Sequence, residues 1–195
     1  MQLLLLLDKN ITNLLNLLLP HNRFFDSFFS FFSLNGGSIF IWLLVIVFIV
    51  ILEEFHHPGI QKTDRKFIIL SFLSFGIAYF LNEFILKNIF HRLRPSSFNQ
   101  FQQISTSFNC PLDFSFPSSH AITAFAMATI ISHFDKKRWW IYYSIAFLIS
   151  FSRIYLGCHY FFDVLVGAVL GFLISKVILQ VNQFLLSPVH KAKHH

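Results

Sequence analysis

Residues 152–163 combine the side chains of this sequence that are best suited to chemistry. The segment reads Ser-Arg-Ile-Tyr-Leu-Gly-Cys-His-Tyr-Phe-Phe-Asp, in a chain otherwise rich in Phe, Leu and Ile. Ionisable residues in such apolar surroundings are costly and usually functional. His159 and Asp163 are four residues apart, so on a helix they would share one face. The carboxylate could then accept a hydrogen bond from one imidazole nitrogen and leave the lone pair of the other free to attack.

Arg153 lies just upstream of this pair, and Gly157 between them would let the backbone turn. Its planar guanidinium is suited to binding phosphate oxygens. The structural alternative is a helix end at which Arg and His satisfy local carbonyl groups.

A second group of cations surrounds residues 87–95. Lys87 and Arg94 are seven residues apart, two helical turns, so they are expected to project from nearly the same face. Pro95 disfavours helix at the residue before it, which would leave Arg94 at a helix end facing a cleft. Glu83 could orient Lys87, and Arg92 is expected to point elsewhere. The alternative is a basic cluster that contacts lipid headgroups.

A third motif, Pro-Ser-Ser-His at 117–120, opens an apolar run. Ser118 or Ser119 is a good helix N-cap, and the free amides of a helix N-terminus bind anions. His120 would lie in the first turn, beside a bound anion. A capped helix with a nearby histidine is the alternative.

Together the three motifs indicate phosphoryl transfer through a phosphohistidine. His159 would attack phosphorus, Asp163 would hold its tautomer, and His120 would protonate the leaving oxygen and then activate water. Negative charge on the phosphoryl oxygens would be stabilised by Lys87, Arg94, Ser118, Ser119 and Arg153.

The elements that must position these residues are predicted to be membrane helices. The chain has 195 residues, 55% hydrophobic and only 12% charged, with a mean hydropathy of +0.61. Soluble domains are about 25% charged. The net charge of +6 does not indicate nucleic-acid binding, because Lys and Arg fall in short loops between apolar runs.

We therefore expect an all-α, polytopic transmembrane helical bundle. Five spans are predicted at 38–52, 67–86, 118–134, 139–156 and 160–180. Residues 1–37 are expected to form amphipathic helices, the first over 2–19 with a polar stripe of Lys9, Thr12, Asn13 and Asn16. These helices would lie at the membrane surface or partly inserted against the bundle; if 2–19 crosses, there are six spans. Residues 38–186 form the predicted membrane domain, and 187–195 a cytoplasmic tail.

Charge distribution predicts the orientation of the bundle. Basic residues at 62–66, at 136–138 and in the tail alternate so as to share the cytoplasmic side. The connection 87–117 and the turn near 153–159, which carry the proposed site, would then share the outer side of the cell membrane. Nothing in the sequence indicates an oligomeric state.

Two pairs of small residues bear on close approaches between segments. Cys110 and Cys158 are both expected outside, where a bridge is permitted. Because the sequence does not define their separation, two unbridged thiols are favoured. Gly167 and Gly171 are spaced for close packing of one helix on another.

With these motifs, the chain resembles the type-2 phosphatidic acid phosphatase superfamily, membrane lipid phosphatases related in fold to vanadium haloperoxidases. That family has Lys, six residues, then Arg-Pro, as in Lys87 to Arg94-Pro95. Its Pro-Ser-Gly-His is Pro-Ser-Ser-His here, with Ser119 in place of Gly. Its Ser-Arg, five residues, His, three residues, Asp is matched from Ser152 to Asp163. The resemblance implies a helical bundle without metal or cofactor, a His159 nucleophile and a His120 acid. It also implies phosphate contacts from Lys87, Arg94, Ser118 and Arg153.

The expected substrate is a lipid phosphate or diphosphate in the bilayer. The short chain and outward site resemble bacterial members that act on undecaprenyl diphosphate, while phosphatidic acid, phosphatidylglycerol phosphate and lipid A phosphate stay open. Three other classes remain: a hydrolase with a metal held by His120, His159 and Asp163, a non-catalytic lipid-binding protein, and a lipid phosphotransferase.

Overall fold

The structure, a computed structural model, describes residues 2–33, 37–56, 59, 61–95 and 110–186, and within these residues its regular secondary structure is entirely helical. The predicted all-α class is therefore confirmed for the described part of the chain. The predicted cytoplasmic tail, 187–195, lies outside the described residues.

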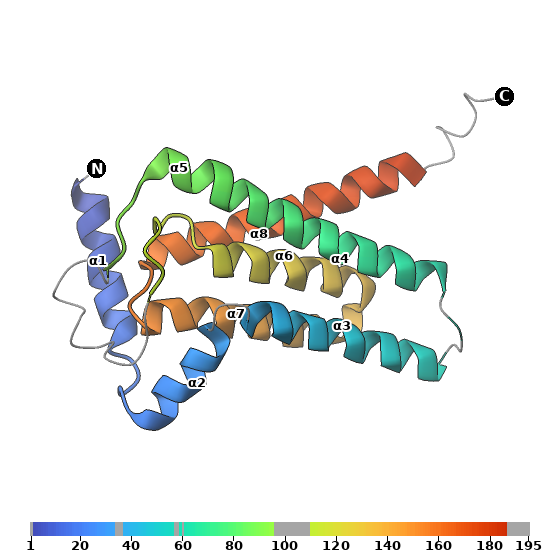
Figure 1. Ribbon diagram of the computed structural model, residues 1–195, viewed down its shortest axis with the longest axis horizontal. Helices are drawn as coiled ribbons and strands as arrows, with labels where there is room; N and C mark the ends of the chain where they lie inside the picture. The colour runs from blue at the N-terminus through green and yellow to red at the C-terminus, as the bar shows by residue number, and fades with distance from the viewer. Residues whose placement is uncertain (1, 34–36, 57–58, 60, 96–109, 187–195) are drawn as a thin grey trace.

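Five elements run side by side along the long axis of the molecule (Figure 1). They are α3 (Gly37–His56), α4 (Lys62–Phe80), α6 (Ser119–Phe134), α7 (Trp139–Tyr155) and α8 (Phe161–Leu186). A π-helical turn, Leu81–Leu86, continues α4 into the short α5 (Lys87–Phe90). Such turns are rare and often occur at functional sites. Here the turn carries the α4 backbone towards the predicted site.

Three of these helical stretches are long and apolar enough to cross a membrane: Gly37–Phe55, Lys62–Phe90 and Phe161–Leu185. Each matches one of the five predicted spans. The other two predicted spans correspond to α6 and α7, which have 16 and 17 residues. At 1.5 Å per residue they are about 24 and 26 Å long, shorter than a typical hydrocarbon core. The number of crossings therefore stays a prediction.

Helix α6 forms the centre of the bundle because its small side chains allow close neighbours. Its alanines at 121, 124, 126 and 128 are fully buried, and α4, α7 and α8 pack around it. On α8, a Cβ atom at Gly167 would lie 2.9 Å from the Ser118 carbonyl oxygen, and one at Gly171 would overlap the carbonyl of Ile122. The predicted close packing at these two glycines is confirmed. It brings the start of α6 against the start of α8.

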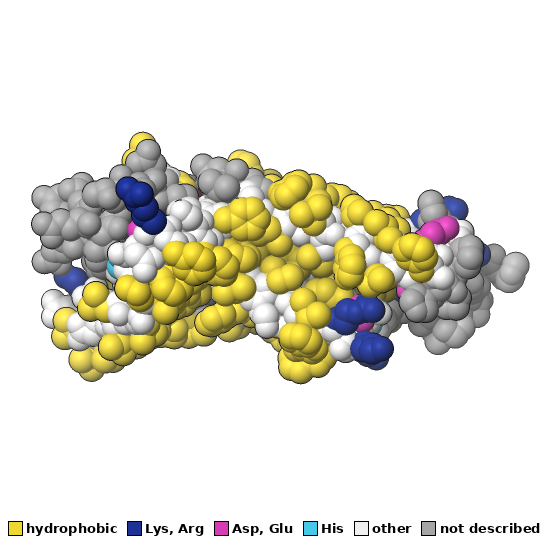
Figure 2. Space-filling view, turned by 90° about the horizontal axis from the view of Figure 1, so that it is seen from below, with side chains coloured by type: hydrophobic (Ala, Val, Ile, Leu, Met, Phe, Trp, Pro, Cys, Tyr) yellow, Lys and Arg dark blue, Asp and Glu magenta, His cyan; other side chains and the backbone are white. Residues whose placement is uncertain are grey.

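Apolar side chains cover the middle of the face shown in Figure 2, and Lys and Arg side chains lie towards its ends. At one end of the bundle, Thr63 and Asp64 share the wall of a small cavity with Lys137 and Arg138. The two basic loops therefore share one end, as the charge pattern predicts. The three motifs lie at the other end.

The N-terminal helices pack against that motif-bearing end (Figure 1). Helix α1 (Gln2–Asn16) buries Asp8, Thr12 and Asn16, whereas most of its leucines are exposed. Its polar face, rather than its apolar face, contacts α7 and α8. Of the two predicted placements, this agrees with packing against the bundle. Helix α2 (Arg23–Ser33) follows and packs on α7.

Candidate active site

A helix C-cap holds His159 in place. Helix α7 ends at Tyr155, and Gly157 adopts the left-handed conformation with φ 69°. The Gly157 amide donates to the Ile154 carbonyl and the Cys158 amide to the Arg153 carbonyl, each at 3.0 Å, which is a Schellman motif. The predicted turn at Gly157 is confirmed. The turn places His159 in the protein interior, where only 1% of the residue's surface is exposed.

His159 faces Asp163, but not for the reason that spacing suggested. Helix α8 begins at Phe161, so His159 lies in the preceding turn and the prediction that both share a helix face is wrong. The His159 Nδ1 and Asp163 Oδ2 atoms are 3.5 Å apart, longer than a normal hydrogen bond. The same carboxylate oxygen accepts a 2.9 Å hydrogen bond from the Tyr160 amide. The pair is therefore adjacent but not tightly bonded.

The other ring nitrogen of His159 is identified as an acceptor by its neighbour. Arg94 Nη1 lies 2.7 Å from His159 Nε2, and a guanidinium can only donate. The lone pair is therefore on Nε2, and in the neutral ring the proton is on Nδ1, towards Asp163. Burial lowers the pKa of His159 well below its usual value, and the charges of Arg94, Arg153 and Lys87 lower it further. At neutral pH the imidazole is uncharged, which is the nucleophilic form.

Lys87 and Arg94 converge on one carboxylate, although their predicted common helix face is wrong. Helix α5 ends at Phe90 and His91 takes a left-handed conformation, so Arg94 lies in a non-helical segment. The Asp113 carboxylate joins the two cations: Oδ1 accepts from Arg94 Nη2 at 2.7 Å, and Oδ2 accepts from Lys87 Nζ. Arg94 Nε also donates to the Asp113 carbonyl at 2.9 Å.

Asp113 was missed by sequence reasoning because it lies in a connection without a motif. Burial raises the pKa of its carboxyl, but the hydrogen bond from Lys87 and the charges of Arg94 and Lys87 outweigh burial, and the pKa lies below its usual value. The carboxylate is thus ionised at neutral pH. It occupies the donors that the motifs assign to phosphate.

The second motif is anchored to the π-helical turn by Ser119. Ser118 is the N-cap of α6 by position, but its hydroxyl makes no capping hydrogen bond. The Ser119 hydroxyl donates to Glu83 and accepts from Asn82 at 2.9 Å. Glu83 also accepts from Lys87 at 2.8 Å, which confirms that Glu83 orients this lysine. The Ser119 side chain therefore supports Lys87 indirectly.

These residues surround a cavity of about 550 Å³. Its polar wall includes six of the predicted site residues: Lys87, Arg94, Ser119, His120, Arg153 and His159. Ser118 and Asp163 are fully buried and do not belong to the lining. Apolar side chains of Ile39, Phe75 and Tyr79 form another part of the wall. The cavity can thus hold a polar phosphate beside an apolar group.

Comparison with known proteins agrees with the motifs. The profile of the PAP2 superfamily matches residues 67–186, which include all three. The chain belongs to the PAP2 superfamily. Among curated PAP2-related proteins, an undecaprenyl-diphosphatase of Sulfolobus acidocaldarius is 33% identical over 75% of this chain and 66% of its own length. A lipid A 4'-phosphatase of Bacteroides thetaiotaomicron is 30% identical over 77% of this chain and 67% of its own length.

Two solved structures have a similar fold. A transmembrane PAP2-type phosphatidylglycerolphosphate phosphatase from Bacillus subtilis superposes with a TM-score of 0.68 and 25% identity, covering 94% of this chain and 88% of that one. Aquifex aeolicus LpxE superposes with a TM-score of 0.59 and 26% identity, covering 89% of this chain and 95% of that one. The sequence matches span between half and two thirds of the first curated relatives' own length.

The N-terminal helices lie outside the PAP2 match but contact its third motif. Arg153 has 1% of its surface exposed, and its Nη1 donates to the Ser33 hydroxyl and, at 3.1 Å, to the Ser33 carbonyl. Arg153 therefore both lines the cavity and holds the end of α2. This contact between Arg153 and Ser33 was not predicted from the sequence.

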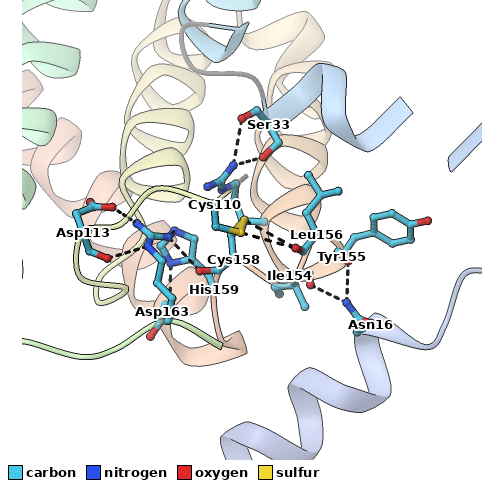
Figure 3. Close-up of a disulfide and its surroundings, with 12 residues drawn as sticks. Asn16, Ser33, Cys110, Asp113, Ile154, Tyr155, Leu156, Cys158, His159 and Asp163 are labelled. Carbon is cyan, nitrogen blue, oxygen red and sulfur yellow. Dashed lines mark hydrogen bonds and ion pairs between the residues drawn. A yellow bond between two sulfur atoms is a disulfide. The ribbon is translucent and has the colours of Figure 1, made fainter. Parts of the chain in front are cut away.

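A disulfide joins Cys110 to Cys158, with 5.4 Å between the two Cα atoms (Figure 3). The expectation of two unbridged thiols is wrong, because the fold brings the segment before the PAP2 Pro-Ser-Ser-His motif against the α7 C-cap. The bridge lies next to His159 and three residues before Asp113. The bridge therefore links the segment that carries Asp113 covalently to the turn that carries His159.

The residues that a metal-dependent hydrolase would use do not form a ligand cluster here. Among the described residues, no group of three or more His, Cys, Asp and Glu side chains is placed to hold a metal ion. The cations Arg94, Arg153 and Lys87 contribute to the field around His159 instead. These three cationic side chains suit the binding of an anion, in agreement with the phosphate contacts predicted from the PAP2 motifs.

Proposed function

We propose that this protein is an integral membrane phosphatase that cleaves a phosphomonoester or diphosphate of a lipid through a phosphohistidine at His159. The observation that supports it most directly is the state of that residue. A buried, uncharged imidazole presents the Nε2 lone pair among Lys87, Arg94 and Arg153 on the wall of the cavity. This arrangement can bind a phosphate and attack it.

The reaction would proceed in two displacements at phosphorus. The phosphate replaces the Asp113 carboxylate on Lys87 and Arg94, and the hydrogen bond from Arg94 Nη1 to His159 Nε2 breaks. His159 Nε2 then forms a bond to phosphorus as the bond to the leaving oxygen breaks. His120 gives that oxygen a proton. Water then attacks the phosphohistidine, His120 takes its proton, and inorganic phosphate leaves. The fixed cations stabilise the charge on the equatorial oxygens in both steps.

A lipid substrate is supported by the cavity and by the relatives. The cavity adjoins the apolar side chains of Ile39, Phe75 and Tyr79. The relatives are named for undecaprenyl diphosphate, lipid A and phosphatidylglycerol phosphate. We take undecaprenyl diphosphate as the first substrate to test.

The proposed topology has five spans, with α6 and α7 crossing beside the three longer helices. The site then faces the outer side, because both basic loops lie at the opposite end of the bundle. Hydrolysis of a water-soluble short-chain lipid phosphate by intact cells, without permeabilisation, tests this orientation. Activity only after permeabilisation would reverse it.

The test of the reaction is phosphate release by purified protein from a panel of lipid phosphates and diphosphates in the presence of EDTA. Orthovanadate, which imitates five-coordinate phosphorus, should inhibit. His159→Asn should abolish turnover and the acid-labile, base-stable phosphoryl label. His133→Asn, a matched change in the last turn of α6, should retain both.

Three results would decide against parts of the proposal. Full activity in folded His159→Asn protein removes the phosphohistidine. Loss of activity in EDTA, restored by zinc, supports the metal-dependent alternative. Transfer of label to an added lipid alcohol rather than to water identifies a phosphotransferase with the same first step.

A further inference from the structure

Two carboxylates and one guanidinium form a network behind His159. Arg92 Nη1 donates to Asp163 Oδ1 at 2.7 Å, and Arg92 Nη2 donates to Asp8 Oδ2 at 2.6 Å. Both aspartate side chains are at most 1% exposed. The guanidinium carbon also lies 4.1 Å from the centroid of the Tyr160 ring. Because a guanidinium carries donors on both terminal nitrogens, Arg92 holds the two carboxylates at once.

The α1 helix supplies capping groups to both sides of the turn that carries His159. The first amides of a helix lack partners within it. At the start of α8, Asp8 Oδ1 accepts from the Phe162 amide and Thr12 Oγ1 from the Phe161 amide, each at 2.9 Å. At the end of α7, Asn16 Nδ2 donates to the carbonyls of Ile154 and Tyr155, at 3.0 and 2.7 Å.

Asp163 connects this network to the nucleophile. Its Oδ1 is occupied by Arg92, while its Oδ2 faces the Tyr160 amide and His159 Nδ1. Rotation of the carboxylate would break the bonds at both oxygens, so Arg92 limits the direction in which Asp163 can accept a proton. Asp8 in turn limits where Arg92 can lie.

We propose that Asp8 and Arg92 are positioning residues for His159, acting through Asp163. The inference rests on the function proposed above. It extends the site beyond the three motifs to α1, which lies outside residues 67–186 of the family match. The network holds the Asp163 carboxylate towards Nδ1, and this keeps the lone pair of His159 on Nε2, where phosphorus is attacked.

A double-mutant cycle on kcat tests the connection. Asp8→Asn keeps the size of the side chain but removes its charge, and kcat should fall about 10- to 100-fold because the nucleophile loses its alignment. KM should change little, since Lys87 and Arg94 are untouched. Asp163→Asn alone should cost about 10²–10³-fold, less than the serine-protease equivalent. The double variant should be no slower than Asp163→Asn, because both changes break one chain of contacts.

The matched control is Asp135→Asn at the other end of the bundle. Asp135 also pairs with an arginine, Arg138, at 2.7 Å. This variant should keep kcat within about twofold of the parent, as expected for a change outside the site. If Asp8→Asn is as mild as this control, or if its effect multiplies fully with that of Asp163→Asn, the positioning role is refuted.

Two further measurements keep the inference testable if Asp8→Asn does not fold or if the parent is inactive. Arg92→Lys keeps the charge but has a single donor group, so it should lose kcat with KM retained; unchanged kcat in the folded variant refutes the inference. Nitrogen-15 NMR of the His159 ring reports its tautomer without turnover. The parent should show the proton on Nδ1, and Arg92→Lys a mixture of tautomers.

The NMR result separates this inference from the proposed function. A parent without phosphatase activity, but with a tautomer that responds to Arg92→Lys, contradicts the function and supports the positioning network. An active parent whose tautomer and kcat ignore both substitutions supports the function and contradicts the network.

Discussion

Substitution of Asp113 by Asn tests whether the site is occupied by its own chain before substrate binds. The Asp113 carboxylate takes the donors of Lys87 and Arg94, the cations proposed to bind phosphate. Substrate must therefore displace this carboxylate. The apparent affinity for substrate is then the intrinsic affinity multiplied by the fraction of protein molecules in which the two cations are already free. Asp113→Asn keeps the shape of the side chain but weakens this competition. We expect tighter binding of substrate.

The size of the effect follows from the contacts. A hydrogen bond to a charged group contributes about 1.5–3 kcal/mol. The Asp113 side chain is 39% exposed, and screening by solvent places its contribution at the lower end of that range. About 1.4 kcal/mol corresponds to a tenfold change in affinity. KM for a lipid phosphate should thus fall about tenfold, with kcat little changed because the two cations and His159 remain.

The assay is initial-rate kinetics of parent and variant in detergent, together with the inhibition constant of orthovanadate, which reports binding without turnover. Because the pKa of Asp113 lies below its usual value, the difference should be constant from roughly pH 5.5 to 8. Glu53→Gln, at the opposite end of the bundle, is the control. A tenfold rise in KM and in the inhibition constant would refute the reasoning, since Asp113 would then hold the cations in their productive positions.

Three other predictions follow from the site. Because burial and neighbouring cations lower the pKa of His159, the acidic fall in kcat/KM that reflects its protonation should be centred below pH 6.5; a midpoint at or above this pH would contradict an uncharged resting imidazole. Ser119→Gly should keep kcat within about tenfold of the parent, since its hydroxyl contacts Glu83 and supports Lys87 only indirectly; collapse of turnover in folded protein would show that the hydroxyl is needed. Cys110→Ser should lower the free energy of unfolding by about 4 kcal/mol, the value for a bridge across 48 residues, and thermal unfolding of the parent with and without reductant checks it.

The parts of the site that could be predicted are those encoded locally. Gly157 predicted the turn between Arg153 and His159, and the four-residue spacing of Glu83 and Lys87 predicted the contact that orients this lysine. Hydropathy also located the five long helices of the bundle, with the ends of α6 and α7 within one residue and those of α3, α4 and α8 up to about six residues away. Each of these depends on neighbours in the sequence.

The remainder depends on contacts between distant segments. Arg92 was expected to point away from the Lys87 face, but no local pattern showed that it would reach Asp8 and Asp163, which are 84 and 71 residues away. Asp113 lies in a connection with no periodicity. The prediction for Arg94 assumed two regular α-helical turns after Lys87. The helix is instead π-helical before Lys87 and ends at Phe90, so that spacing does not apply. Such features follow from tertiary packing, which one sequence does not display.

The Cys110–Cys158 bond also changes how far apart the two proposed catalytic histidines are along the covalent structure. His120 lies inside the ring that the bond closes, and His159 lies just beyond it. By way of the sulfur atoms, the path between the two imidazoles is about a dozen residues rather than about 39, and loop-closure entropy favours the shorter path by about 1 kcal/mol. Acid and nucleophile therefore remain near neighbours even in an unfolded, oxidised chain, and the helices between them, α6 and α7, must refold as a closed loop.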